Sequence, residues 1–202
     1  MAKLLLATSN RGKAHEYLSL LDGIPFDLVT LADEGIRFEV EETGESLEEN
    51  ARLKAVAVAL ESKCMVMADD SGLEVQILDG APGRLSARWA GENASDDDRV
   101  AYLLSKLKGV PMEERSAQFR CVIAISTPDG EVELCSGECR GLIALEPKGN
   151  EGFGYDPVFY LPELGKTMAQ MPLEVKNRYS HRGKAALKAR LVLEKLKAGR
   201  SA

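Results

Sequence analysis

The sequence predicts an α/β protein, with a mixed β-sheet core flanked by helices, in one domain that spans residues 1–202. Three observations favour this class. Short apolar runs alternate with segments of helical period, polar loops with glycine separate them, and the second half opens with a β-hairpin. Hydrophobic residues make up 45% of the chain and charged residues 29%, a balance that is typical of globular proteins and excludes general disorder.

Charge and composition also exclude several partners. The net charge of −6 argues against binding along a nucleic-acid polymer, and 5% of aromatic residues is too low for a platform that stacks bases. The apolar run that follows Lys3 is too short for a signal-peptide core, and no later run approaches the ~20 residues of a membrane helix. The four cysteines form no Cys-x-x-Cys pair. We therefore expect a cytoplasmic protein that binds neither a nucleic-acid polymer nor a membrane.

The first elements are a predicted strand, loop and helix. Lys3–Ala7 has the apolar composition of a short buried strand, and the polar stretch Thr8–Lys13 follows it. From Ala14 to Leu21, apolar residues recur at helical spacing. Gly23–Pro25 ends that helix, and Phe26–Leu31 is a second predicted strand.

A capped helix and a buried strand come next. Ser46 and Glu49 have the spacing of a capping box, and the apolar stripe behind them predicts a helix over residues 47–62. The apolar run Cys64–Ala68 predicts a buried strand that ends abruptly at the polar stretch Asp69–Gly72.

The second half adds a hairpin and two more helices. Alternation from Leu73 to Ile77 predicts a separate strand, and Ser95 with Asp98 caps another helix. Residues 117–139 form a hairpin with Pro and Gly in its turn, which we expect to belong to a smaller second lobe. A basic helix over residues 184–197 ends the chain.

The loop between the first strand and helix has the residues of a phosphate site. It offers hydroxyls, backbone N–H groups at a helix N-terminus and an ammonium group. Its residues are Thr8, Ser9, Asn10, Arg11, Gly12 and Lys13. It lacks the Walker A pattern, and an ordinary strand-to-helix turn stays open as the alternative.

Asp69–Gly72 places two adjacent carboxylates after a buried strand. Such carboxylates can bind Mg²⁺ or hold a water molecule for proton removal, and ligands gather beyond the carboxyl ends of strands in open α/β sheets. The acidic stretch Glu39–Glu45, which contains Glu41 and Glu42, could complete an oxygen-ligand set for a hard cation. A polar turn and a solvated acidic run are the alternatives.

Two late segments have the residues of a base pocket. An aromatic ring in Phe153–Asp156 can stack on a base, while His181 and Arg182 donate hydrogen bonds to ring oxygens. For His181 alone, a surface position near a helix start is the alternative. Together, the phosphate cradle, the carboxylates and the base pocket predict an enzyme that acts on nucleotides with Mg²⁺, although spacing does not say which bond breaks.

Six ordered blocks carry a resemblance to a known family. They are Thr8-Ser9-Asn10-x-x-Lys13, Glu42-Thr43-Gly44 with Glu49-Asn50 and Lys54, Ala68 through Leu73, Ala81-Pro82-Gly83 with Ser86-Ala87-Arg88, Gly152 through Pro157, and Ser180-His181-Arg182. From Lys3 to about Leu196, the chain strongly resembles the inosine/xanthosine triphosphate pyrophosphatase family. The resemblance implies a homodimer whose subunit has an elongated mixed sheet and two lobes around a central nucleotide-binding cleft.

The resemblance also implies a reaction and the residues that perform it. The reaction is Mg²⁺-assisted attack of water on the α-phosphorus of non-canonical purine nucleoside triphosphates (ITP, dITP and XTP). It yields the monophosphate and pyrophosphate and keeps deaminated purines out of DNA and RNA. By position, Asp70 is implied as the general base and as a Mg²⁺ ligand, with Glu42 as the second ligand and its neighbour Glu41 as the open alternative.

The implied substrate contacts lie in both halves of the chain. They are Thr8, Ser9, Asn10, Arg11, Gly12, Lys13, Lys54, Ser71, Phe153, Gly154, Tyr155, Asp156, Lys176, His181 and Arg182. Arg11 stands where the family's residue varies, so it has no role beyond the loop. Two competing functions stay open: a nucleotide-binding regulatory module without turnover, and a general NTP phosphohydrolase.

Overall fold

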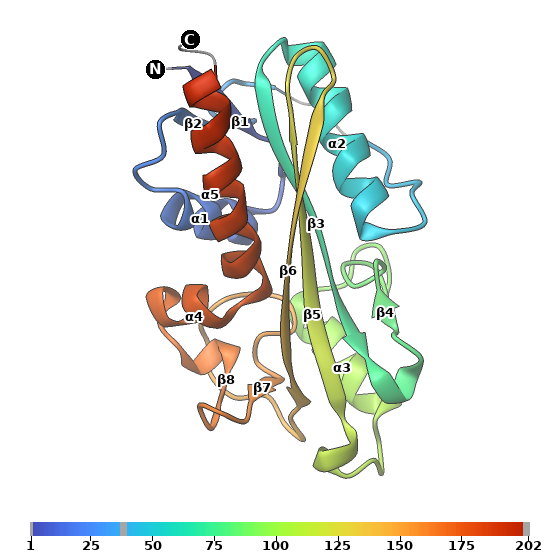
Figure 1. Ribbon diagram of the computed structural model, residues 1–202. Helices are drawn as coiled ribbons and strands as arrows, with labels where there is room; N and C mark the ends of the chain where they lie inside the picture. Colours follow the sequence, from blue (N-terminus) through green and yellow to red (C-terminus); the bar gives the residue numbers. More distant parts are fainter. Residues whose placement is uncertain (1, 37–39, 200–202) are drawn as a thin grey trace. The chain divides into compact units, whose positions relative to one another are not determined.

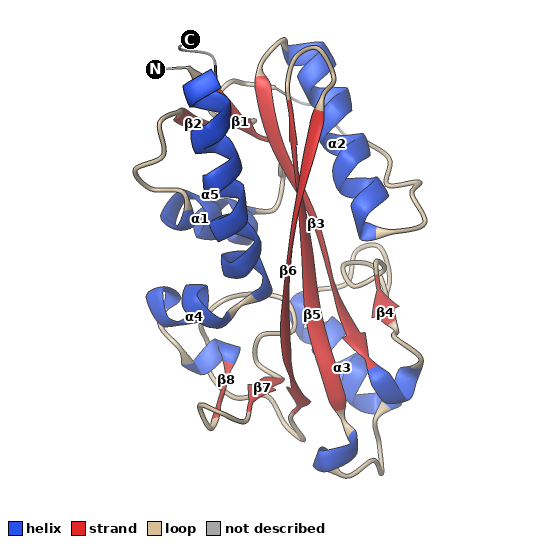
Figure 2. Cartoon of the chain, viewed as in Figure 1, coloured by secondary structure: helices blue, strands red, loops and turns tan. Residues whose placement is uncertain are grey.

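The computed structural model describes residues 2–36 and 40–199, and these form an eight-stranded sheet with helices (Figure 1). The strand order is β2-β1-β3-β5-β6-β7-β8, with β4 paired to β3. β1 (Lys3–Leu6) runs parallel to β2 (Asp27–Thr30) and β3 (Met65–Val75), whereas β7 (Phe159–Leu161) is antiparallel to β6 (Val132–Ile143). The predicted mixed α/β class is therefore confirmed (Figure 2).

The chain divides into two compact units. Unit 1 comprises residues 1–70, 121–137 and 182–202, and unit 2 comprises residues 71–120 and 138–181. The strands β3, β5 (Ser116–Ser126) and β6 contribute residues to both units. The hairpin that we assigned to a smaller lobe is therefore divided between the two.

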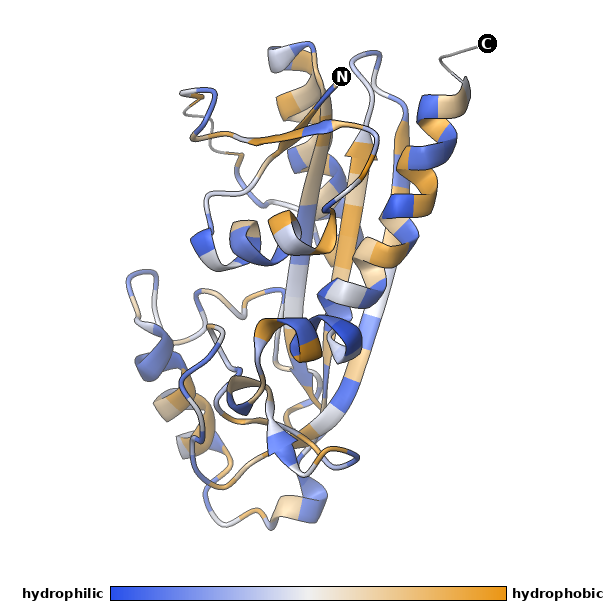
Figure 3. Ribbon diagram, turned by 90° about the vertical axis from the view of Figure 1, so that its left-hand side faces the viewer, coloured by the Kyte–Doolittle hydropathy of each residue, from blue (hydrophilic) through white to orange (hydrophobic). Residues whose placement is uncertain are grey.

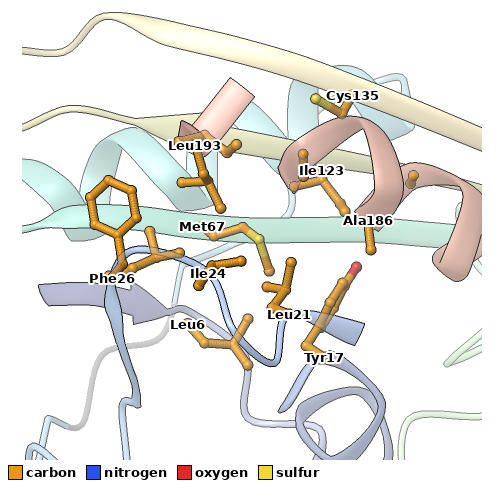
Figure 4. Close-up of a cluster of buried hydrophobic side chains, with 14 of the residues drawn as sticks. Leu6, Tyr17, Leu21, Ile24, Phe26, Met67, Ile123, Cys135, Ala186 and Leu193 are labelled. Carbon is orange, nitrogen blue, oxygen red and sulfur yellow. The ribbon is translucent and has the colours of Figure 1, made fainter. Parts of the chain in front are cut away.

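Unit 1 buries side chains on both faces of its strands, as the alternation of strand residues requires. One set of alternate residues packs with α1 (Arg11–Leu20) and α5 (His181–Gly199), and the other set packs with α2 (Leu47–Ser62). The first set includes Leu4, Leu6, Met65, Met67, Cys121 and Ile123, several of which are drawn in Figure 4. The second includes Leu5, Val66, Ala68, Val122 and Ala124.

β3 differs from the sequence prediction in a way that matters for the site. We expected a strand that ends at Ala68, a turn, and a second strand from Leu73, but the structure has one strand through all of these residues. Alternation then directs adjacent side chains to opposite faces of the sheet. Asp69 faces the side of α1 and α5, whereas Asp70 faces α2, so the two carboxylates do not form a pair.

Two helices begin earlier than their apolar periodicity predicts. α1 begins at Arg11, because the Asn10 side chain accepts a hydrogen bond from the backbone N–H of Lys13 and caps the helix. α5 begins at His181, three residues before the predicted start at Lys184. Its buried face includes Ala185, Ala186, Ala189 and Leu193, and Figure 3 shows hydrophobic and hydrophilic residues alternating around its turns.

Unit 2 packs its strand segments with two further helices. α3 (Asp96–Lys106) begins with the predicted capping box of Ser95 and Asp98, and α4 (Leu173–Tyr179) was not predicted. β4 (Pro82–Gly83) and β8 (Lys166–Thr167) are short edge elements. Leu73, Leu103, Phe119, Ile143, Tyr155 and Phe159 are among the residues of its hydrophobic core.

Two further expectations concern the surroundings of the chain. None of the helices in residues 2–36 and 40–199 combines the length and the apolar character that a membrane crossing requires. All four cysteines are free thiols, and Cys121, Cys135 and Cys139 are buried.

Candidate functional site

The predicted phosphate loop forms the entry to α1. The Thr8 hydroxyl accepts a hydrogen bond from the backbone N–H of Asn10 at 3.2 Å, and the Asn10 side chain caps the helix. Arg11, Gly12 and Lys13 lie in the first helical turn, where an α-helix has no carbonyl partner for its N–H groups. Ser9, Asn10 and Arg11 are exposed. This turn is therefore suited to an anion, as the residue types predicted.

Lys13 is bound to the buried carboxylate of Asp69. Its ammonium nitrogen lies 2.9 Å from Asp69 Oδ2. The Cys121 thiol lies 3.9 Å from the same oxygen, and burial raises the Cys121 pKa to about 12, so this thiol stays neutral. Burial alone would raise the pKa of Asp69, but the charges of Lys13 and Arg182 outweigh it and hold this pKa below its ordinary value. Asp69 is therefore an ionised partner that fixes the Lys13 side chain.

Asp70 lies among residues of α2 and of the segment that precedes it. Asn50 Nδ2 donates to Asp70 Oδ2 at 3.1 Å, and Asn50 Oδ1 accepts from the backbone N–H of Gly44 at 2.8 Å. The Lys54 ammonium lies 2.6 Å from Glu42 Oε1 and 3.6 Å from Asp70 Oδ1. Two carboxylates from distant positions in the sequence thus converge on one cation.

The charges around Asp70 set its protonation. Burial raises the pKa of Asp70 above its ordinary value, and the opposing charges of Lys54 and Lys13 do not fully offset it. Burial lowers the pKa of Lys54, but the carboxylates of Asp70, Asp69 and Glu42 outweigh it, so this pKa is raised. A carboxylate with a raised pKa beside a cation has the character of a general base.

Glu42 and Asp70 fit a hard divalent cation. Both are oxygen donors, and they already converge on a positive charge at Lys54. Glu41, the open alternative to Glu42, is exposed, and Glu39 lies outside the described residues. Within the described part of the chain, no three His, Cys, Asp or Glu side chains form a group that could hold a metal ion. Two carboxylates suffice for Mg²⁺, which usually completes its shell with water and substrate phosphate oxygens.

Arg182 is buried in unit 1 at the start of α5. Its guanidinium donates to Glu16 Oε2 at 2.5 Å and lies over the ring of Tyr17, 5.8 Å from its centroid. Burial lowers the Arg182 pKa, but the charges of Glu16, Tyr17 and Asp69 together outweigh this and raise it. Glu16 on α1 therefore holds a permanently charged donor group in a fixed orientation.

In unit 2, the predicted aromatic loop is built around a buried ion pair. Asp156 Oδ2 accepts from the backbone N–H of Phe153 at 2.8 Å and binds the ammonium of Lys176. The same ammonium lies 5.0 Å from the centroid of the Phe153 ring. A Cβ at Gly152 (φ +77°) would lie 2.1 Å from Asp156 Oδ2, so only glycine fits there. Lys176 on α4 thus joins the loop that the sequence pattern singled out.

His181 is neither exposed nor in a loop. It is 3% exposed and its ring stacks on Phe119, with centroids 4.6 Å apart and planes at 11°. The alternative of a surface residue is therefore wrong, because the aromatic ring of β5 covers the imidazole. Ser71 follows Asp70 directly on β3 and is half-buried.

The sequence profile of the Ham1 family matches residues 4–191 of this chain. The chain belongs to the Ham1 family. A Geobacter sulfurreducens relative named dITP/XTP pyrophosphatase is 52% identical, over 92% of this chain and 93% of that relative. A Bacillus subtilis relative with the same name is 45% identical, over 96% and 98% of the two chains.

Solved Ham1 structures have the same fold. A HAM1 protein from Coxiella burnetii matches with a TM-score of 0.87 and 38% identity, over 96% of this chain and all of that one. The Staphylococcus aureus Ham1 protein matches with a TM-score of 0.84 and 43% identity, over 96% and 98% of the two chains. The resemblance inferred from the six motif blocks is therefore confirmed for this Ham1 protein.

Sequence reasoning missed two partners of the predicted site residues in this Ham1 protein. Asn50 was noted only as part of a motif, and Glu16 was not singled out. Both are buried polar residues on helices, and both bind a charged group of the site. Their signal in the sequence is a polar residue on the apolar stripe of a helix, which is costly unless it has a partner.

Proposed function

We propose that this protein hydrolyses ITP, dITP and XTP to the nucleoside monophosphate and pyrophosphate. The observation that carries the proposal is the environment of Asp70. This carboxylate has a raised pKa and is held by Asn50, and it approaches a cation that it shares with Glu42. The names of the relatives, dITP/XTP pyrophosphatase, support the same reaction.

In the proposed reaction, Asp70 accepts a proton from a water molecule as the water oxygen attacks the α-phosphorus. The bond from that phosphorus to the bridging oxygen breaks, and pyrophosphate leaves with the bond's electron pair. Lys13 and Lys54 place positive charge beside the phosphate oxygens, where charge develops in the transition state. The loop that enters α1 and the first turn of this helix, together Thr8 to Lys13, bind the triphosphate through backbone N–H groups and hydroxyls.

Asp70 and Glu42 would hold the divalent cation, for which we propose Mg²⁺. When bound, this ion supplies further charge neutralisation on the phosphates. Asp69 takes no part in the ion's coordination in this proposal, because it faces the other side of β3 and binds Lys13. Its role is to hold the Lys13 ammonium.

We propose that the Phe153 loop of unit 2 binds the nucleoside. Arg182 is a further proposed substrate contact, as the family resemblance implies. The Phe153 ring offers a stacking surface for the base. Asp156, which is paired with Lys176, fixes the backbone of Phe153. Hypoxanthine and xanthine carry a 6-oxo acceptor that a donor such as Arg182 can meet, whereas adenine carries an amino group there. Leaving a buried donor unpaired costs about 1–3 kcal/mol, which corresponds to about 5- to 150-fold discrimination against ATP. His181, Gly154, Tyr155 and Ser71 complete the proposed substrate contacts.

The experiment is a substrate panel with the purified protein and Mg²⁺, in which the phosphate product is identified. We expect pyrophosphate from ITP, dITP and XTP, with ATP much slower. Release of orthophosphate would contradict the proposed bond cleavage, and equal rates on ATP and ITP would indicate a general NTP phosphohydrolase. Nucleotide binding without turnover under any divalent metal would indicate a regulatory module.

We also propose that the protein works in the cytoplasm as a homodimer. The free thiols of all four cysteines suit a reducing compartment. Sedimentation equilibrium at several concentrations tests the dimer, and a single species of 22.0 kDa at all of them would contradict it. Cell fractionation tests the compartment.

A further inference from the structure

The loop that carries Phe153 is anchored at successive residues, all within unit 2. Its first anchor is the Asp156 carboxylate, which accepts from the backbone N–H of Phe153. Its last anchor is Tyr155, whose hydroxyl donates to the backbone oxygen of Ser86 at 3.0 Å. Tyr155 is buried, and burial raises its pKa to about 12, so the hydroxyl stays protonated and can donate. The residue between these anchors, Gly154, has a partner of its own.

That partner is Asp96, the first residue of α3. Asp96 Oδ2 accepts from the backbone N–H of Gly154 at 2.7 Å, across 58 positions of sequence. Its other oxygen, Oδ1, accepts from Arg99 at 2.5 Å, which fixes the orientation of the carboxylate. Gly154 has a φ of +63°, which glycine adopts readily. Because glycine has no side chain, nothing within the residue itself restricts its backbone to this conformation. The Asp96 bond therefore restricts the N–H side of the Phe153–Gly154 peptide, whose carbonyl oxygen accepts from the backbone N–H of Asp156 at 3.2 Å.

Asp96 is not needed to begin the helix. Ser95 and Asp98 already form a complete capping box there, with bonds of 2.9 and 3.1 Å in the two directions. Asp97 adds a further negative charge in the same turn and is exposed. A general effect of acidic residues at a helix N-terminus would apply to Asp97 as well. The bond to Gly154 distinguishes Asp96.

We infer that Asp96 is a positioning residue for nucleoside binding. By holding the Gly154 peptide, it sets the direction in which the Phe153 ring faces the base. The inference rests on one part of the proposed function, namely that the Phe153 loop binds the nucleoside. It assigns a role in substrate recognition to α3, which carries none of the implied substrate contacts.

The test compares Asp96→Ala and Asp96→Ser with the matched control Asp97→Ala, which removes the same charge from the same turn. Serine suits a first helical turn, but its side chain is too short to reach Gly154. For both Asp96 variants we expect KM for ITP and Kd for IMP to rise about tenfold, the loss expected for a hydrogen bond to a charged group. We expect kcat to change less than threefold. Asp96→Asn keeps an acceptor and should restore most of the affinity, and Asp97→Ala should behave as wild type.

Inhibition by inorganic tripolyphosphate separates positioning from a general loss of structure. This probe has no nucleoside, so its Ki should stay within twofold of wild type in every variant. An unchanged KM and Kd in Asp96→Ser, or an equal loss in Asp97→Ala, overturns the inference. If the wild type binds IMP but does not hydrolyse ITP, the proposed function fails, and the IMP data still decide the role of Asp96. If the wild type does not bind IMP, both fail.

Discussion

Asn50 is buried on α2 and joins two parts of the candidate site. It donates to the Asp70 carboxylate at 3.1 Å and accepts from the backbone N–H of Gly44 at 2.8 Å. The substitution Asn50→Leu keeps the number and branching of the side-chain heavy atoms but removes both hydrogen bonds. It therefore tests how much the orientation of Asp70 depends on this one amide.

The expected losses of kcat and of stability follow from these two hydrogen bonds. A hydrogen bond to a charged group contributes about 1.5–3 kcal/mol, so an Asp70 that loses this orientation should lower kcat by about 10- to 150-fold. The orphaned N–H of Gly44 is buried and should lower the free energy of unfolding by a further ~1–3 kcal/mol. Steady-state kinetics on ITP gives the first quantity, and urea unfolding gives the second.

The variant Asn50→Asp keeps an acceptor for Gly44 but places a second carboxylate beside the buried Asp70. Because the two negative charges repel each other, we expect both kcat and the free energy of unfolding to fall. If Asn50→Leu kept a kcat within threefold of wild type, the amide would not position Asp70, and the reasoning would be refuted.

Four further outcomes concern Asp70, Lys13 and a buried arginine of unit 2. Asp70→Asn should lower kcat by about 10²- to 10⁴-fold and leave the Kd for IMP unchanged, as expected for loss of a general base; near-normal rates would rule out that role. Burial raises the pKa of Asp70 above 3.8, and a protonated carboxyl cannot accept a proton. We therefore expect kcat/KM to fall with decreasing pH at a midpoint above 3.8. A midpoint at or below 3.8 would contradict this. Lys13→Ala should raise KM for ITP and Ki for tripolyphosphate together, and an increase in KM alone would place Lys13 at the nucleoside. Arg115 donates hydrogen bonds to the backbone oxygens of Leu107, Val110 and Ala144. Arg115→Met should therefore lower the free energy of unfolding in urea by about 3–5 kcal/mol. The control is Arg140→Met at an exposed position, and an equal loss in both variants would contradict the reasoning.

The elements with a strong local signal agree with the sequence prediction. The helical period after Ser46 predicted α2 with its observed bounds, although Leu53 and Leu60 of the expected apolar stripe are exposed. The capping pattern at Ser95 predicted the start of α3. The capping box predicted for Ser46 and Glu49 is only partly formed. The Ser46 side chain accepts from the backbone N–H of Glu49, but the Glu49 carboxylate accepts from Glu45 rather than from Ser46.

β3 shows where local reasoning failed. Asp69, Asp70, Ser71 and Gly72 are typical turn residues, yet all four continue the strand. Tertiary partners compensate for burying the two charges there. Lys13 binds Asp69, while Asn50 and Lys54 bind Asp70, and these partners lie up to 56 positions away in the sequence. No local pattern contains that information.

The amino-acid sequence alone was sufficient for the fold class and the family, because periodicity, capping and ordered motifs can be read along the chain, and it predicted the residue types of a nucleotide site. Only the tertiary structure decided which charges meet. It directs the two aspartates to opposite faces of one strand, brings Glu42 to the cation of Lys54, and holds Gly154 on Asp96. The physical reason is that a buried charge is stable only with a partner within hydrogen-bonding distance, and folding alone brings that partner there.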